Sequence, residues 1–151
     1  MSKSVKTPCI GVCSTVFGDD VCRGCKRFQH EVIEWNSYSD SEKDSVLARL
    51  ETLKTQIMES KVFISDQSRL KDQLEALKIV FNKETNPYCW VFDLFRHASK
   101  SIGDPSKFGF KIITKETNNL LVLKKIIEEE LFELSEAHYQ RYFEVGKHFN
   151  A

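Results

Sequence analysis

Four of the five cysteines lie within residues 9 to 25, and their spacing is typical of a metal site. Three residues separate Cys9 from Cys13, two separate Cys22 from Cys25, and eight lie between the pairs. A turn within each pair can bring both sulfurs to the same side, and two such pairs complete a tetrahedral set of thiolates. We therefore predict that Cys9, Cys13, Cys22 and Cys25 bind one metal centre.

The residues around the cysteines favour ligands over unrelated buried thiols. Gly11 and Gly24 each lie inside a pair, where a tight turn benefits from a residue that tolerates positive φ. The segment has too few bulky apolar side chains to bury four thiols in a core of their own. Lys26 and Arg27 add positive charge beside the second pair, and a helix predicted to start at Cys25 would favour thiolate over thiol there.

The cysteine set by itself leaves the identity of the metal open. An all-thiolate set suits zinc and also an iron–sulfur cluster. Zinc would be structural, because four protein sulfurs leave no open position for a catalytic water. A cluster would instead imply electron transfer or redox sensing. We take zinc as the working interpretation and keep the cluster as its alternative.

The residues around the cysteines resemble a known bacterial family. Its pattern is similar to the runs 7–13 (TPCIGVC), 22–25 (CRGC), 31–35 (EVIEW) and 41–43 (SEK) of this chain. The family is the domain-of-unknown-function family numbered 1289 (DUF1289), and the resemblance covers about residues 7–55. It implies a four-cysteine metal-binding protein, since members are described as predicted iron–sulfur proteins. Phe28 replaces a small hydroxyl residue and the loop at Val16 to Gly18 is slightly long, but neither departure touches a predicted ligand.

The composition is that of an ordinary globular protein. Hydrophobic residues make up 41% and charged residues 29%, and the formal net charge is zero, so no global field attracts nucleic acid or acidic membranes. The longest apolar stretch, Leu120 to Leu123, is too short for a membrane span, and no signal peptide is recognisable. We expect a cytoplasmic protein, in which reducing conditions leave clustered cysteines available as ligands or redox groups.

Hydrophobic periodicity predicts a mostly α fold, with a small four-cysteine metal-binding knuckle at the N-terminus followed by an all-α helical body. Ser39 to Glu42 has the pattern of a capping box, Ser65 or Asp66 can cap a helix, and Asn86 is a cap followed by proline. A short strand within 108–114 has no obvious partner. We expect a four-cysteine domain with following helices over 1–55 and a helical domain over 56–151. The predicted helices cover about residues 25–35, 39–57, 66–81, 87–98 and 118–145.

Three further side chains are of types that can act at a functional site. Cys89 lies in a strongly apolar run and is predicted to be a buried, inert thiol. His30 follows the cysteines closely, but four sulfurs already complete a site, so it is predicted to be a solvated helix residue. His138 falls on the apolar stripe of the last helix, where a hydrogen-bonded core histidine is the more common role.

No catalytic motif stands out, so no catalytic residue is predicted and we do not expect an enzyme. The first hypothesis is an accessory protein with a zinc-stabilised head that contacts another protein, or a second copy of itself, through its helices. The second is an iron–sulfur redox or sensor protein. The third is a zinc-finger-like nucleic-acid binder that uses Arg23, Lys26, Arg27 and the basic stretch 96–125. The third is less favoured, because the acidic segment 126–145 of the same chain can neutralise that stretch.

Overall fold

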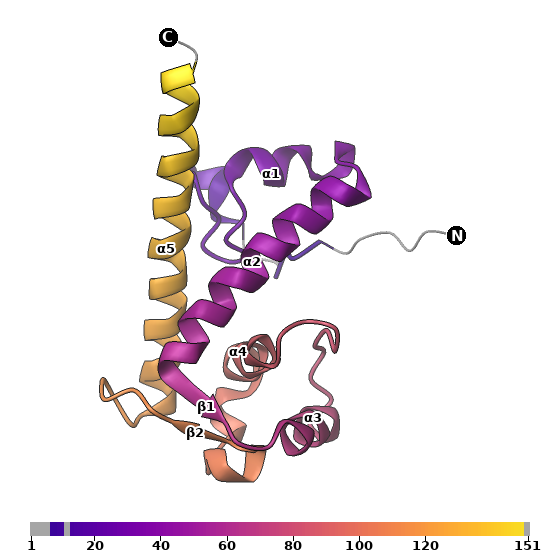
Figure 1. Ribbon diagram of the computed structural model, residues 1–151, viewed down its shortest axis with the longest axis vertical. Helices are drawn as coiled ribbons and strands as arrows, with labels where there is room; N and C mark the ends of the chain where they lie inside the picture. Colours follow the sequence, from indigo (N-terminus) through magenta and orange to yellow (C-terminus); the bar gives the residue numbers. More distant parts are fainter. Residues whose placement is uncertain (1–6, 11–12, 150–151) are drawn as a thin grey trace. The chain divides into compact units, whose positions relative to one another are not determined.

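The computed structural model describes residues 7–10 and 13–149 and is mostly helical, as predicted (Figure 1). Side chains are described except those of Phe17 and of residues 143–149. In this part of the chain there are five α-helices and two short strands. The helices are α1 (Gln29–Glu34), α2 (Asp40–Lys61), α3 (Gln67–Ala76), α4 (Pro87–Ala98) and α5 (Leu120–Phe149), and the strands are β1 (Val62–Ile64) and β2 (Phe110–Ile112).

The chain forms two compact units. The first takes in Met1–Leu50 and Leu131–Ala151 as far as these are described, and the second is Glu51–Glu130. Helices α2 and α5 each contribute one part to each unit. The functional division predicted between residues 1–55 and 56–151 stays a prediction.

In the first unit, α2 begins at the predicted capping box. The Ser39 amide donates to Glu42 Oε1 at 3.1 Å, and the Glu42 amide donates to Ser39 Oγ at 3.2 Å, so each side chain satisfies an amide at the helix start. One turn further along, Val46 and Leu50 of α2 bury their side chains with Trp35 in a small apolar cluster. This cluster holds α2 against the chain that follows α1.

In the second unit, α4 carries the core. Asn86 Oδ1 accepts the Tyr88 amide at 3.0 Å and Pro87 occupies the first helical turn, which confirms the predicted start of the helix. Six side chains of this helix are buried, so the apolar run is a core element and not a surface one. They are Cys89, Trp90, Val91, Phe92, Leu94 and Phe95.

The predicted strand within 108–114 exists, and the structure supplies its partner. Strand β2 pairs antiparallel with β1, with Val62 opposite Ile112 and Ile64 opposite Phe110. The segment of β1 is where helical periodicity lapses after α2. Its β-branched residues instead pair with a strand that lies 48 positions later in the chain, which no local pattern reveals.

Helix α3 ends earlier than predicted. Asp66 caps its start by accepting the Arg69 amide at 3.0 Å, as expected, but the helix stops at Ala76 and not near Phe81. Lys78 adopts φ +57, and the amide of Ile79 donates to Leu74 O at 3.0 Å, which closes the helix end. Phe81 lies in the loop beyond, 5.4 Å from the ring of Trp90, so its apolar position reflects a tertiary contact and not a further helical turn.

The last helix runs from Leu120 to Phe149, close to the predicted range. Among the described helices, this one included, none is both long enough and apolar enough to cross a membrane.

Candidate metal centre

Cys22 and Cys25 lie in one tight turn. The Cys22 amide donates to Arg27 O and the Lys26 amide donates to Cys22 O, each at 2.8 Å, while Val21 and Phe28 pair across the base of the turn. Lys26 takes a left-handed conformation, with φ +66, that lets the chain reverse. Helix α1 begins only after Phe28, so the prediction that a helix starts at Cys25 was wrong: amides of a turn, not of a helix end, surround the sulfurs.

The sulfur of Cys22 lies in a pocket of backbone amides. Cys22 is 1% exposed, and this burial raises the pKa of its thiol. Hydrogen bonds from the amides of Cys25, Ser14 and Gly24, and from the Cys25 thiol, together lower that pKa by more, so the net shift is downward. Amide donors of this kind stabilise a thiolate, which is the form that binds metals.

The sulfur of Cys25 has a different environment. The residue is 3% exposed, and burial raises the pKa of its thiol. Arg27 opposes this, because its Nε–H donates to Cys25 Sγ at 3.3 Å, but the net shift remains upward. The two opposite shifts make Cys22 the more acidic thiol of the pair.

Cys13 is tied to this turn through its neighbour. Ser14 donates its amide to Cys22 Sγ, and its hydroxyl accepts the Arg23 amide at 2.8 Å. The Cys13 side chain is half-buried, and its sulfur lies 3.0 Å from Thr15 Oγ1. The backbone of the first pair thus meets the turn of the second, as a two-pair site requires.

Cys9 is exposed, and its amide donates to Thr7 Oγ1 at 3.3 Å. Gly11, which the sequence predicts to allow the first turn, lies outside the described residues. Over residues 7–10 and 13–149, no three or more His, Cys, Asp or Glu side chains are grouped closely enough to hold an ion. The structure therefore brings Cys22 and Cys25 together with the backbone beside Cys13, and the four-ligand set stays a prediction.

Two buried cations lie beside these sulfurs. Lys26 is 1% exposed and its ammonium donates to the carbonyl oxygens of Arg23 and Gly24 within the turn. Arg27 is 4% exposed and lies over the ring of Trp35, with Cζ 4.8 Å from the centroid. Buried positive charge next to buried sulfur fits an anionic thiolate centre. From the sequence, Arg27 was only a nearby charge; no spacing rule reveals its contact with Cys25, because the left-handed Lys26 between them reverses the chain.

The same burial bears on nucleic-acid binding. Lys26 and Arg27 are enclosed by the protein, so neither presents its charge to a phosphate backbone. In the second unit, Arg96 pairs with Glu128 of α5, with Nε–Oε1 at 2.8 Å, and Lys61 pairs with Glu130 at 2.9 Å. The expected neutralisation between the basic stretch and the acidic helix thus occurs at the Arg96–Glu128 pair.

The other candidate side chains have ordinary structural settings. Cys89 is buried, its sulfur lies 3.4 Å from Thr55 Oγ1, and burial raises the pKa of its thiol, as suits an inert core cysteine. His30 is half-buried and its ring stacks on Tyr142 with 6.0 Å between centroids, so it belongs to an aromatic contact. His138 is half-buried on α5.

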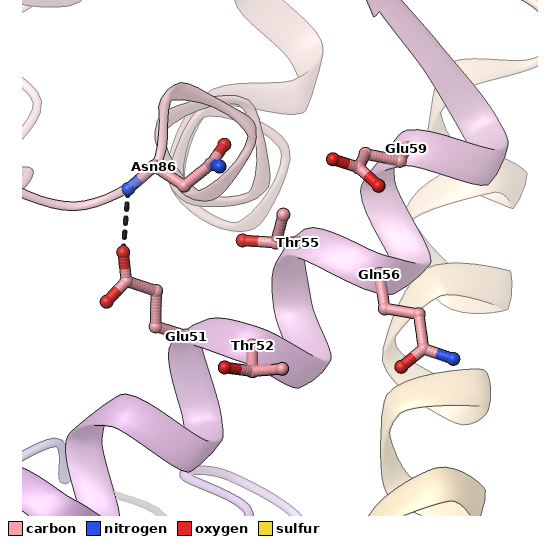
Figure 2. A pocket seen from close by; sticks show the side chains of 6 residues that line it. All are labelled: Glu51, Thr52, Thr55, Gln56, Glu59 and Asn86. Carbon is pink, nitrogen blue, oxygen red and sulfur yellow. Dashed lines mark hydrogen bonds between the residues drawn. The ribbon is translucent and has the colours of Figure 1, made fainter.

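A groove of about 480 Å³ lies beside α2 in the second unit. Figure 2 shows that carboxylate, amide and hydroxyl side chains line the groove. The backbone N–H of Asn86 donates a hydrogen bond to Glu51 Oε1 at 2.8 Å. Among the described residues, no cysteine or histidine lines this groove. Its lining residues are Glu51, Thr52, Thr55, Gln56, Glu59 and Asn86.

Comparison with known proteins bears on the N-terminal segment. Residues 7–54 match the family described as "Protein of unknown function (DUF1289)". This confirms the resemblance, and the DUF1289 segment contains all four clustered cysteines, α1 and most of α2. The segment is also similar to the "Uncharacterized protein YdhL" of Escherichia coli (strain K12) and of Shigella flexneri, with 44% identity over 45 residues to each.

These matches cover only part of each protein. They take in 28% of this chain and 53% of each relative, so the chain spans about half the length of the curated relatives it matches. No solved structure matches the chain. The comparisons therefore show that residues 7–54 are similar to a family of unknown function.

Proposed function

We propose that this protein is a non-catalytic accessory protein whose DUF1289 segment binds one zinc ion through Cys9, Cys13, Cys22 and Cys25. The observation that carries the proposal is the environment of Cys22, a buried sulfur that accepts three backbone amides and lies beside the Cys25 thiol. Metal-bound thiolates are commonly held by such amide donors, which fix their orientation and offset their charge.

The role of zinc would be structural. Four sulfur ligands leave no position for a reacting water, and the segment before α1 offers few apolar side chains for a core. Binding of zinc to such a site can supply on the order of 10 kcal/mol towards folding. In the reducing cytoplasm, where we place the protein, the four thiols would remain available as ligands.

The proposed partner is another protein. Ile33 of α1 is 72% exposed and Tyr142 of α5 is 61% exposed, and both lie in the unit that carries the cysteines. Exposed large apolar and aromatic side chains are frequent in protein interfaces. The zinc-bound segment would hold α1 in the orientation that such an interface requires.

An iron–sulfur cluster is the second candidate, and the same amide donors favour it. Hydrogen bonds to cluster sulfurs and nearby positive charge raise reduction potentials, so the turn would suit an electron carrier or a redox sensor. Cys22 and Cys25 would then be ligands to iron, and Arg27 would be a donor to a ligand sulfur.

Metal analysis of the full chain tests both candidates. The protein is purified without oxygen, and zinc, iron and acid-labile sulfide are measured together with the visible spectrum. A colourless protein with about one zinc per chain supports the proposal. A brown protein with iron and sulfide overturns the zinc assignment in favour of the cluster, and a protein with neither metal overturns both.

Single substitutions then test the ligands. Each of Cys9, Cys13, Cys22 and Cys25 is replaced by serine, and Cys89→Ser is the matched control, since its sulfur contacts Thr55 in the other unit. We expect each of the four variants to lose most of the metal, and Cys89→Ser to retain it. Full metal content in any of the four removes that residue from the ligand set.

A further inference from the structure

Arg27 is a buried cation whose polar side-chain contact is a cysteine. Its Nε–H donates to Cys25 Sγ at 3.3 Å, its guanidinium covers the ring of Trp35, and no carboxylate of the described residues forms an ion pair with it. Arg49, in the same unit, instead pairs with the carboxylate of Glu31 at 2.6 Å. The guanidinium of Arg27 thus has the sulfur of Cys25 as its hydrogen-bond acceptor.

A buried guanidinium needs a negative partner. It cannot shed its proton at physiological pH, and leaving its charge unpaired in the interior is costly. The ring of Trp35 supplies part of the compensation through a cation–π contact. A neutral Cys25 thiol would be a weak acceptor, whereas a metal-bound thiolate carries the negative charge that the guanidinium lacks.

Lys26 is a second buried cation at the same turn. It holds φ +66, a left-handed conformation that favours glycine, and yet its long side chain is enclosed. Its ammonium donates to the carbonyls of Arg23 and Gly24, between the two cysteines of the second pair. The enclosed ammonium of Lys26 thus places a positive charge inside the turn that carries Cys22 and Cys25.

We infer that Arg27 and Lys26 are positioning residues of the metal centre, which supply the positive charge that its thiolates require. This inference rests on the proposed function. A divalent ion with four thiolates carries a net charge of about −2, and burying that charge is unfavourable unless cations lie nearby. The two enclosed cations of this turn would neutralise it and direct a hydrogen bond to one ligand sulfur.

The test compares zinc affinity among full-length variants, with zinc alone as the probe and a chromophoric chelator as the competitor. We expect Arg27→Met to bind zinc about 10–100-fold more weakly, the usual effect of losing a donor to a metal ligand. Arg27→Lys should recover part of this loss, because lysine keeps the charge but not the planar donor that covers Trp35. Lys26→Gly should weaken binding about tenfold, since glycine suits the backbone while the ammonium is removed.

Arg49→Met is the matched control. Arg49 is a cation of the same unit that covers the ring of Phe28 and pairs with Glu31, and its described contacts include no cysteine. We expect this variant to lose stability and to keep the zinc affinity of the wild type. If the role of Arg27 were purely structural, Arg27→Met would likewise lose stability and keep the zinc affinity of the wild type.

Cobalt substitution gives a second readout that fold stability alone does not move. Loss of the Arg27 donor should shift the thiolate-to-cobalt charge-transfer band of the protein, and Arg27→Lys, which retains the charge, provides this readout if Arg27→Met does not fold. Wild-type zinc affinity and an unshifted band in Arg27→Lys and Lys26→Gly would overturn the inference. A wild-type protein that binds no metal would overturn the proposed function itself, which is a distinguishable result.

Discussion

Arg49 and Glu31 form a bidentate ion pair, with Nη1–Oε2 at 2.7 Å and Nη2–Oε1 at 2.6 Å. The pair joins α2 to α1, and the Glu31 side chain is only 6% exposed. Glu31 Oε1 also accepts the Phe28 amide at 2.8 Å, and the Arg49 guanidinium lies 4.0 Å from the centroid of the Phe28 ring. One carboxylate thus connects the end of the cysteine turn to the following two helices.

Replacing Arg49 by methionine should cost about 3 kcal/mol of unfolding free energy, because it leaves the Glu31 carboxylate buried without its cation. Urea unfolding of the full chain measures the loss. Arg69→Met is the control: Arg69 pairs with Asp66 at 3.9 Å with both side chains at least half exposed, so its loss should stay within about 0.5 kcal/mol. Equal losses in the two variants would contradict a special role for the buried pair.

Gly109→Ala should be strongly destabilising, by about 3 kcal/mol or more, because the added Cβ would lie 2.2 Å from Asp66 O at a position with φ +76. Gly103→Ala is the matched control. Its φ is +55, but a Cβ there meets nothing within 4 Å, so only the left-handed penalty of about 1 kcal/mol applies. Thermal or urea unfolding distinguishes them, and the idea fails if Gly103→Ala is the more harmful change.

Lys78→Gly should stabilise the protein by about 1 kcal/mol. Lys78 is exposed, follows the end of α3 and adopts φ +57, which glycine tolerates without a penalty. Lys71→Gly provides a control of opposite sign, since Lys71 lies within the same helix, where glycine costs about 1 kcal/mol. Urea unfolding measures the change in unfolding free energy for both variants. A loss of stability in both would show that the backbone conformation of Lys78 does not decide the effect of glycine.

Lys61 should make stability depend on pH at both extremes. Burial lowers the pKa of Lys61, but hydrogen bonds with Glu116 and Glu130 raise it by more, while the hydrogen bond with Lys61 lowers the pKa of Glu116. The Glu116 contribution is therefore complete above pH 4.5 and lost as pH falls through its folded pKa. The Lys61 contribution is complete below pH 10.5 and lost as pH rises through its folded pKa.

Unfolding free energies of the wild type and Lys61→Met, measured by urea at several pH values, test this dependence. The difference between the two proteins should be constant from about pH 5 to 10 and should change below pH 4.5 and above pH 10.5, where one partner becomes neutral. A difference that stays the same down to pH 3 would show that the Lys61–Glu116 contact contributes nothing to folding.

Local chemistry made several elements predictable. The caps at Ser39, Asp66 and Asn86 each satisfy an amide two or three residues away, so their residue types alone indicate where α2, α3 and α4 begin. The mostly helical class was also predictable, because apolar residues that recur every three or four positions form one face of a helix. The spacing of the four cysteines also predicts a shared site, since two short turns suffice to bring pairs of sulfurs together, and that site stays a prediction.

Only the tertiary structure decided the contacts that no local sequence pattern predicts. The pairing of β1 with β2, the burial of Arg27 against Cys25 and Trp35, and the loop position of Phe81 depend on how the chain packs. A sequence shows which residues carry charge or apolar surface, but their partners are selected by the burial and hydrogen bonding of the whole unit. The cysteine spacing was therefore evident from the sequence, while the amide and guanidinium donors around Cys22 and Cys25 emerged only from the fold.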